Sequence, residues 1–392
     1  MTKLEKLIQE LCPEGVEYKE ISEVTNYEQP SKYIVKSTAY RDEYEIPVLT
    51  AGQSFVLGYT DESDGVYPAS KATPVIIFDD FTAAFKWVVF PFKVKSSAMK
   101  IITAKEDSLL IRFLFHWMGV LNYSSTEHTR LWIGTYSKFR IPVPPLPVQR
   151  EIVRILDNFT ELTAELTAEL TARKQQYEFY RDQLLTFAAQ GETILTDKPN
   201  ALNRLCQYVS EFIFVKLSDI SVNCDSLRKP VTSGNREAGN IPYYGASGIV
   251  DYVKDYIFDG DYLLISEDGA NLLARNTPIA FSISGKNWVN NHAHILRFNN
   301  RITQRYVEIY LNSIDLSPYI SGGAQPKLNQ QNLYKIPIPL PSYQKQKEIV
   351  TILDRFDTLC TDLSSGLPAE IEARQKQYEY YRDKLLSFEE KI

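Results

Sequence analysis

The sequence predicts an α+β protein with two similar domains, each a twisted, mostly antiparallel β-sheet with helices, separated by two long helices that pack as an antiparallel coiled coil. Three observations predict this fold. One stretch is helical without interruption, many short apolar segments are broken by turn residues, and the second half repeats the first. A repeat period near half the chain makes each half one structural unit, so we expect pseudo-two-fold organisation.

The duplication is carried by matched segments in matched order. QYEFYRDQLLTF at residues 176–187 recurs as QYEYYRDKLLSF at residues 377–388. Upstream, EIVRILD at residues 151–157 recurs as EIVTILD at residues 348–354. We therefore expect a first αβ domain, a central long helix, a connector with a second αβ domain, and a C-terminal long helix, at 1–146, 147–187, 188–341 and 342–392.

The first domain begins with an amphipathic helix at residues 4–11, followed by strand-like segments at 46–52, 74–78 and 87–92. A buried helix is expected at residues 109–121. The second domain repeats this plan, with strands at 262–266 and 293–298, a helix at 306–314 and a strand end at Ile336.

The central helix is expected over residues 147–187. Pro147 suits a first helical position, and no Gly or Pro follows until Gly191. Apolar residues from Val148 to Leu166, including Ile155, alternate steps of four and three, which is typical of a coiled-coil seam. An extra step of four, typical of a stutter, falls in a tandem TAEL tetrapeptide at residues 163–170. At ~1.5 Å per residue the helix would span about 60 Å.

A helix of this length must pack on another element or act as a spacer. The tyrosines favour a helix–helix seam over base stacking. The residues assigned to the two long helices are Leu162, Leu166, Leu170, Tyr177, Tyr180, Leu184, Tyr378, Tyr381 and Leu385. The C-terminal helix should kink or break between Ser364 and Pro368, because Gly366 and Pro368 interrupt it.

Composition limits the function classes. Apolar residues at 44% indicate packed cores, and a net charge of −6 does not indicate nucleic-acid binding, so any basic patch must arise by folding. The spacing of the cysteines favours free thiols over a disulfide or zinc framework. No apolar signal region or membrane-length run occurs, so we expect a soluble, cytoplasmic protein with no membrane partner.

A search for catalytic motifs finds none. The nearest phosphate-loop match ends at Gly285-Lys286, but Ala280 stands where the first glycine is required. His292 and His294 lie two apart on an expected strand, so both should point to one face. A metal site there would need further ligands, and ordinary strand or surface histidines are favoured; no metal site is predicted.

Several loops have residue types that suit DNA contact. Gln and Asn can pair bidentately with adenine and Lys with guanine, and small glycines let the backbone approach phosphate. Ordinary solvated turns are the alternative for each loop. The candidate DNA-binding residues are Thr50, Gly52, Gln53, Ser54, Lys86, Arg130, Ser247, Gly269, Asn271, Gly323, Gln325, Lys327 and Asn329.

A protein with two similar domains suits a duplex, because two-fold proteins bind paired half-sites at a separation fixed by protein geometry. Domains that have diverged would read different half-sites. The spacer would then act as a ruler, in which one tetrapeptide adds ~6 Å against about 3.4 Å per base pair.

The chain resembles the specificity subunits of type I restriction-modification enzymes over essentially its whole length. The resemblance is carried by both copies of P-x-P…Q-x-E-I-V-x-I-L-D and Q-Y-E-x-Y-R-D-x-L-L-x-F, and by residues 244–252, 267–272 and 325–329. The first domain departs from it, because Arg130-Leu131-Trp132-Ile133-Gly134 stands in place of Gln-Pro-Lys-Leu-Asn.

The resemblance implies that each domain reads half of a split site in double-stranded DNA. It also implies that the helices bind two methyltransferase (modification) subunits, which methylate adenine with S-adenosylmethionine. Motor-nuclease (restriction) subunits that use ATP and Mg would complete the complex. The chain itself would be non-catalytic and bind no cofactor.

Two other functions remain open from the sequence. One is a duplicated scaffold that assembles other proteins without binding DNA, which the neutral-to-acidic domains favour. Salt-dependent duplex binding by the assembled complex would distinguish it from the specificity subunit. The other is an enzyme, which turnover by the isolated chain would reveal.

Overall fold

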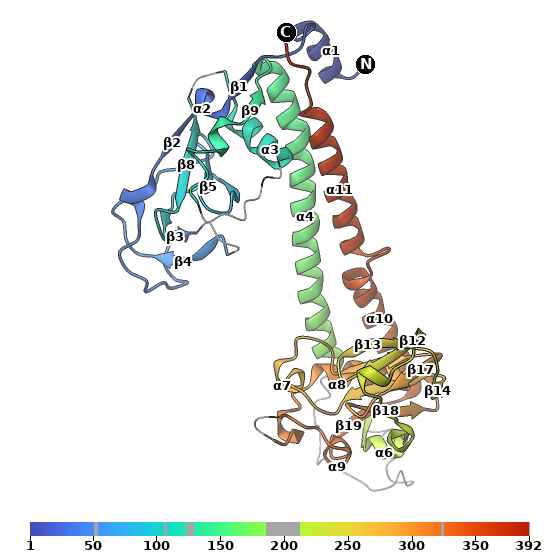
Figure 1. The fold of residues 1–392 in the computed structure, drawn as a ribbon. Helices are drawn as coiled ribbons and strands as arrows, with labels where there is room; N and C mark the ends of the chain where they lie inside the picture. Colours follow the sequence, from blue (N-terminus) through green and yellow to red (C-terminus); the bar gives the residue numbers. More distant parts are fainter. Residues whose placement is uncertain are drawn as a thin grey trace. The chain divides into compact units, whose positions relative to one another are not determined.

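The computed structural model describes residues 1–50, 54–105, 108–121, 123, 129–185, 212–322 and 325–391. The chain forms two compact units, Met1–Ala168 with Ala369–Ile392, and Glu169–Pro368. Each unit contains one αβ domain and parts of the long helices (Figure 1). Among the described residues, no helix is long and apolar enough to cross a membrane.

The first domain begins with a capped helix and continues mainly as short strands. Thr2 and Glu5 form a capping box at the start of this helix, which satisfies its free N–H groups. The elements are α1 (Lys3–Leu11), β1 (Tyr18–Glu20), α2 (Ile21–Val24), β2 (Thr25–Glu28), η1 (Pro30–Tyr33), β3 (Ile46–Leu49), β4 (Val56–Thr60), β5 (Val75–Asp79), β6 (Phe85–Val88), β7 (Lys93–Val94), β8 (Met99–Ala104), α3 (Ile111–Leu121), η2 (Tyr136–Lys138) and β9 (Arg140–Pro142).

The second domain repeats this plan. Asn300 caps its main helix by accepting a hydrogen bond from the backbone N of Thr303, so the helix begins five residues before the expected Tyr306. The elements are β10 (Phe212–Val215), α6 (Leu217–Ile220), β11 (Ser221–Asn223), η3 (Asp225–Leu227), η4 (Ser233–Asn235), β12 (Ala238–Gly245), β13 (Gly248–Val253), β14 (Phe258–Asp259), β15 (Tyr262–Ser266), α7 (Asn271–Ala274), β16 (Ala280–Ile283), β17 (Lys286–Val289), β18 (Ala293–Phe298), α8 (Arg301–Ser313), η5 (Ser317–Tyr319), α9 (Gln330–Leu333) and β19 (Ile338–Pro341).

The main sheet has the same strand order in both domains. The order is β2-β8-β5-β6 in the first domain and β11-β18-β15-β16 in the second, and all neighbours are antiparallel. The central strands β5 and β15 are buried along their whole length. Smaller sheets, β4-β3-β7 and β13-β12-β17-β14, contain the parallel pairs β3·β7 and β12·β17. The predicted α+β class with mostly antiparallel sheets in two similar domains is confirmed.

The long helix α4 (Leu146–Leu185) is continuous and contributes to both units. Its first turns pack into the first domain's core, where Val148, Ile152 and Leu156 are fully buried. The expected seam used Ile155, which is only half-buried. The difference arises because this end of α4 buries a face against the domain as well as against a helix.

Each unit pairs α4 with a C-terminal helix. In the second unit, Tyr180 packs on Phe356 of α10 (Tyr343–Thr361), with ring centroids 5.6 Å apart. In the first unit, Phe159 stacks on Tyr381 of α11 (Leu367–Leu385) at 5.3 Å. Phe159 and Phe356 occupy equivalent places in the duplication, as do Tyr180 and Tyr381, so the two units repeat one contact.

The predicted break in the C-terminal helix is confirmed, since α10 ends at Thr361 and α11 begins at Leu367. The Asp362 side chain accepts hydrogen bonds from Ser364 and Ser365, which lower the pKa of this carboxyl to about 2. A Cβ on Gly366 would lie 2.6 Å from the carbonyl oxygen of Asp362, so only glycine fits this turn.

Candidate nucleic-acid interface

Three of the candidate loops meet at one end of the second domain. Ser266, the last residue of β15, donates a hydrogen bond from Oγ to the carbonyl of Ala246 (2.5 Å), in the turn between β12 and β13. Beyond Ser266, Asp268 forms an antiparallel bridge with Lys327, and Gly269 N donates to Pro326 O at 3.1 Å. The turns at 245–248 and 266–271 and the loop at 325–329 therefore form one surface.

This surface presents exposed polar side chains together with locally bonded ones. Ser247, Gly269 and Gln325 are exposed, and Lys327 is 51% exposed. Asn271 instead bonds both ways with the backbone of Thr277. Asn329 caps α9 by accepting from the backbone N of Asn332 at 2.9 Å. Gly323 lies outside the described residues. The exposed side chains are accessible to solvent, whereas the two asparagines are used within the loops.

The ammonium group of Lys327 forms an ion pair with the half-buried carboxylate of Glu267. Nζ of Lys327 lies 3.2 Å from Oε1 of Glu267, whose other oxygen accepts a hydrogen bond from Nη1 of Arg228 at 2.7 Å. Burial opposes ionisation of Glu267, but Arg228, His294 and Lys327 outweigh it and hold its pKa below the ordinary value. The site is thus a half-buried anion held between cations.

The first domain has the same arrangement at the same places. Leu131 N donates to the carbonyl of Asp80, the residue after β5, at 2.8 Å, as Leu328 N does to that of Glu267, the residue after β15. This correspondence makes Arg130 the counterpart of Lys327. Arg130 is 57% exposed, and its Nη1 lies 3.8 Å from Oδ2 of Asp80.

The other first-domain candidates are less closely joined. Thr50 N donates to Phe55 O at 3.0 Å in the β3–β4 turn, and Ser54 is exposed there. Gly52 and Gln53 of this turn lie outside the described residues. Lys86 is exposed on β6, while the neighbouring Trp87 packs inward against Phe115 of α3.

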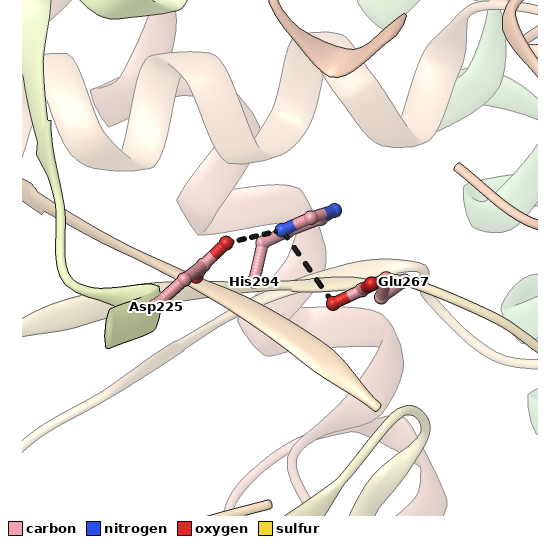
Figure 2. Close-up of side chains that lie close together, drawn as sticks. All are labelled: Asp225, Glu267 and His294. Carbon is pink, nitrogen blue, oxygen red and sulfur yellow. Dashed lines mark hydrogen bonds and ion pairs between the residues drawn. The ribbon is translucent and has the colours of Figure 1, made fainter. Parts of the chain in front are cut away.

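A group centred on His294 lies beneath the loop at residues 325–329. Figure 2 shows its three residues, Asp225, Glu267 and His294. His294 is 1% exposed; its Nδ1 lies 2.6 Å from Oδ2 of Asp225, and its Nε2 lies 2.7 Å from the carbonyl oxygen of Leu328. His292, two residues before it, is half exposed and bonds to Asp268. The two histidines therefore belong to different groups.

Asp225, Glu267 and His294 have ligand atoms within 4.8 Å of one another, a spacing that could hold a metal ion. The contacts argue against one, because Asp225 accepts from His294 and Glu267 accepts from Arg228. A guanidinium already supplies the positive charge that a metal would bring. We therefore assign no metal to this group.

Sequence reasoning missed the residues beneath the loops, namely Asp80, Lys100, Asp225, Arg228 and Glu267. A signal was available, because Asp80 and Glu267 each directly follow a fully buried strand at equivalent places in the duplication. Acidic residues at such positions need a partner.

The assigned helix residues lie partly in seams and partly in solvent. Nδ1 of His116 lies 3.0 Å from the hydroxyl of Tyr378, while Tyr177, Leu184 and Leu385 pack against the domain cores. Leu166 and Leu170 are half-buried, and Leu162 is exposed. Phe179 and its counterpart Tyr380 are 59% and 62% exposed. Each unit therefore presents an aromatic side chain at the same repeat position.

Comparison with known proteins places these features in context. The family model described as the type I restriction modification DNA specificity domain matches residues 13–173 and 210–373, one match for each half of the duplication. A type I restriction enzyme specificity subunit of Escherichia coli, EcoR124I/EcoR124II, is 40% identical and aligns over 99% of this chain and 97% of its own length. A specificity subunit assigned in Haemophilus influenzae is 41% identical over 46% of this chain and 48% of its own length.

The fold is similar to that of a solved S subunit of a type I restriction-modification system from M. genitalium. The TM-score is 0.60 with 15% identity, over 95% of this chain and 96% of the other. At this identity the likeness concerns the fold.

Proposed function

Because the chain belongs to the family of type I restriction-modification specificity subunits, we propose that it reads a two-part sequence in double-stranded DNA, one half-site per domain. The observation that carries this is the pair Arg130 and Lys327. Each is an exposed cation that directly precedes a buried leucine. The backbone N of that leucine donates a hydrogen bond to the carbonyl oxygen of the residue that follows the central strand.

The surroundings of the two cations provide the chemistry for different half-sites. Lys327 stands beside exposed Gln325, and amide and ammonium groups can contact adenine and guanine respectively. Arg130 stands two residues before the buried Trp132, and its guanidinium can bind guanine bidentately. The exposed Gly269, which has no side chain, allows backbone N–H groups of its turn to approach phosphate. The two cations occupy equivalent positions in the two domains but have different neighbours. This difference suits a DNA site whose two halves have different sequences.

We also propose that the long helices set the half-site spacing and bind two modification subunits. The recognition domains would comprise residues 1–146 and 188–341, and the spacer helices 147–187 and 342–392. Phe179-Tyr180 and Tyr380-Tyr381 are repeated, partly exposed aromatic pairs, and aromatic residues are enriched at protein interfaces. Two like surfaces suit two copies of one partner.

The chemistry of the assembled enzyme would belong to its other subunits. S-adenosylmethionine would serve the methyltransferase subunits, and ATP with Mg the motor-nuclease subunits, in the cytoplasm. The specificity chain would contribute DNA recognition and assembly and no reacting group.

The test is methylome sequencing of cells that carry this chain with its modification partner. We expect a split motif with one modified adenine on each strand. If no new methylation arises while the partner is active with another specificity chain, the recognition proposal fails. The scaffold function would then stand, with the helices assembling other proteins.

A further inference from the structure

The buried His294 holds the recognition loop of the second domain by two hydrogen bonds of defined polarity. Its Nε2 lies 2.7 Å from the carbonyl oxygen of Leu328, which can only accept. Its Nδ1 lies 2.6 Å from the carboxylate of Asp225, whose pKa is held below the ordinary value because bonds from His294 and the backbone outweigh the effect of burial. The imidazolium form of His294, with a proton on each ring nitrogen, satisfies both acceptors at once.

The same loop residue is fixed from its other side. Leu328 N donates to the carbonyl of Glu267 at 2.8 Å, and Leu328 is fully buried. Both peptide groups of Leu328 are therefore bonded, one to Glu267 and one to His294. Lys327 precedes this fixed residue and Asn329 follows it. The two bonds of Leu328 therefore fix the backbone position from which the exposed Lys327 side chain extends.

The first domain fills the equivalent positions with different residues of the same charge type. Asp79 pairs with Met99 as Ser266 pairs with Ala293, so Lys100 occupies the position of His294. Nζ of Lys100 lies 3.1 Å from Oδ2 of Asp80 and donates to Oε1 of Gln29, which corresponds to Asp225. Oδ1 of Asp80 accepts from the backbone N of Trp132 at 2.8 Å. Both domains thus place a buried cation beside the carboxylate that underlies the loop.

From this repeated geometry we propose that His294 and Lys100 are positioning residues for DNA recognition, each setting the loop that carries the cation of its own domain. The proposal rests on the proposed DNA-reading function. Neither residue is proposed to contact DNA itself. Each acts through the backbone or the carboxylate beneath Lys327 or Arg130, so its loss should affect discrimination at one half-site only.

The test uses the complex of the full chain with its modification subunits and three short duplexes: the methylome-determined site, and that site with either half scrambled. His294→Ala should reduce the preference for an intact second half-site by roughly tenfold, the scale of one good base contact. The preference at the first half-site should stay unchanged. Lys100→Ala should give the mirror result.

Two further variants separate positioning from a general loss of folding. Tyr306→Phe is the matched control, because Tyr306 is also fully buried in the second domain and donates a hydrogen bond to a backbone carbonyl, that of Pro339, but lies on α8 and makes no bond to the described residues of the loops. It should lower thermal stability without changing either preference. The double variant His294→Lys with Asp225→Gln transplants the first-domain pair and should restore much of the preference lost in His294→Ala.

The salt dependence of binding gives an independent measurement. The slope of log affinity against log salt should stay unchanged in His294→Ala, whereas removing a phosphate contact reduces the slope by about one. An unchanged second half-site preference in His294→Ala, or an equal loss at both half-sites, overturns the inference. A wild-type complex that prefers neither half-site would overturn the DNA-reading function itself.

Discussion

Arg305 donates a hydrogen bond from Nε to Oδ1 of Asp354 over 2.7 Å, which ties helix α8 of the second domain to helix α10. Arg112 and Asp157 make the same bond between the same atoms, also at 2.7 Å, and tie α3 to α4 in the first unit. The duplication therefore preserves the attachment of each αβ domain to a long helix. This attachment is what a ruler requires, because a half-site position is defined only if the domain is fixed to the helix.

Replacing Arg305 should loosen that attachment. Arg305→Ala leaves Asp354, Asp357 and Glu308 without their shared partner, and burial already raises the pKa of Glu308. We expect a loss of about 2 kcal/mol in the free energy of unfolding of the second unit, measured with urea. Arg301→Ala on the same helix removes a more exposed pair with Asp261 and should cost much less. Equal losses would contradict the attachment role.

Gln149 should be as important in the first unit. Its buried amide donates to the carbonyls of Ser108 and Pro144 and accepts from Leu110 N, all within 2.8 Å. Gln149→Leu leaves these buried backbone groups without hydrogen-bond partners and should destabilise the unit by about 3 kcal/mol. The counterpart Gln346 repeats the bond to a proline carbonyl, at Pro341. Thermal unfolding checks this, with the exposed Gln344→Leu as control; similar melting of both variants would exclude the role.

Deleting residues 167–170 should change the spacing between the half-sites. The deletion shortens α4 by ~6 Å, which corresponds to roughly one to two base pairs at about 3.4 Å each. Methylome sequencing should show both half-sites retained with a shorter gap. Replacing the same four residues by four alanines is the control and should leave the gap unaltered. A change in the half-sites themselves would refute the ruler.

Lys327 and Arg130 should each affect one half-site. Lys327→Ala should weaken binding to duplexes with an intact second half-site by about tenfold, and Arg130→Ala should do so for the first. Competition binding at fixed salt measures both. Lys254→Ala removes an exposed lysine paired with Glu237 and should have little effect. Equal weakening at both half-sites would instead indicate a folding defect.

The N-terminal helix should detach in acid. Hydrogen bonds from Arg154 and Lys3 lower the pKa of Glu151 to about 2, against an ordinary value of 4.5. A lowered pKa in the folded state stabilises the fold above pH 4.5, and this contribution is lost as the pH falls toward 2. Glu151→Gln should cost on the order of 1 kcal/mol at pH 7 and almost nothing at pH 2. A cost that does not change with pH would disprove the ionic contribution.

The sequence by itself determined the duplication, the long helix, the helix break and the fold class. These features depend on local chemistry: repeated segments, the lack of Gly and Pro from Val148 to Gln190, and Gly366 with Pro368 in the last helix. Local propensities act over a few residues, so they can be read without knowing the rest of the chain. The candidate loops were found in the same way, from residue types that suit turns and polar contact.

Only the tertiary structure decided which of those residues face outward and what lies beneath them. Asn329 and Asn271 have the composition of base-contacting residues, yet both bond to neighbouring backbone. Lys327 and Glu267 are 60 residues apart in the chain, and their ion pair exists because the strand β15 and the loop after η5 end at the same place. His294 and Lys100 correspond only through the strand register, since an imidazolium and an ammonium share charge but no sequence pattern.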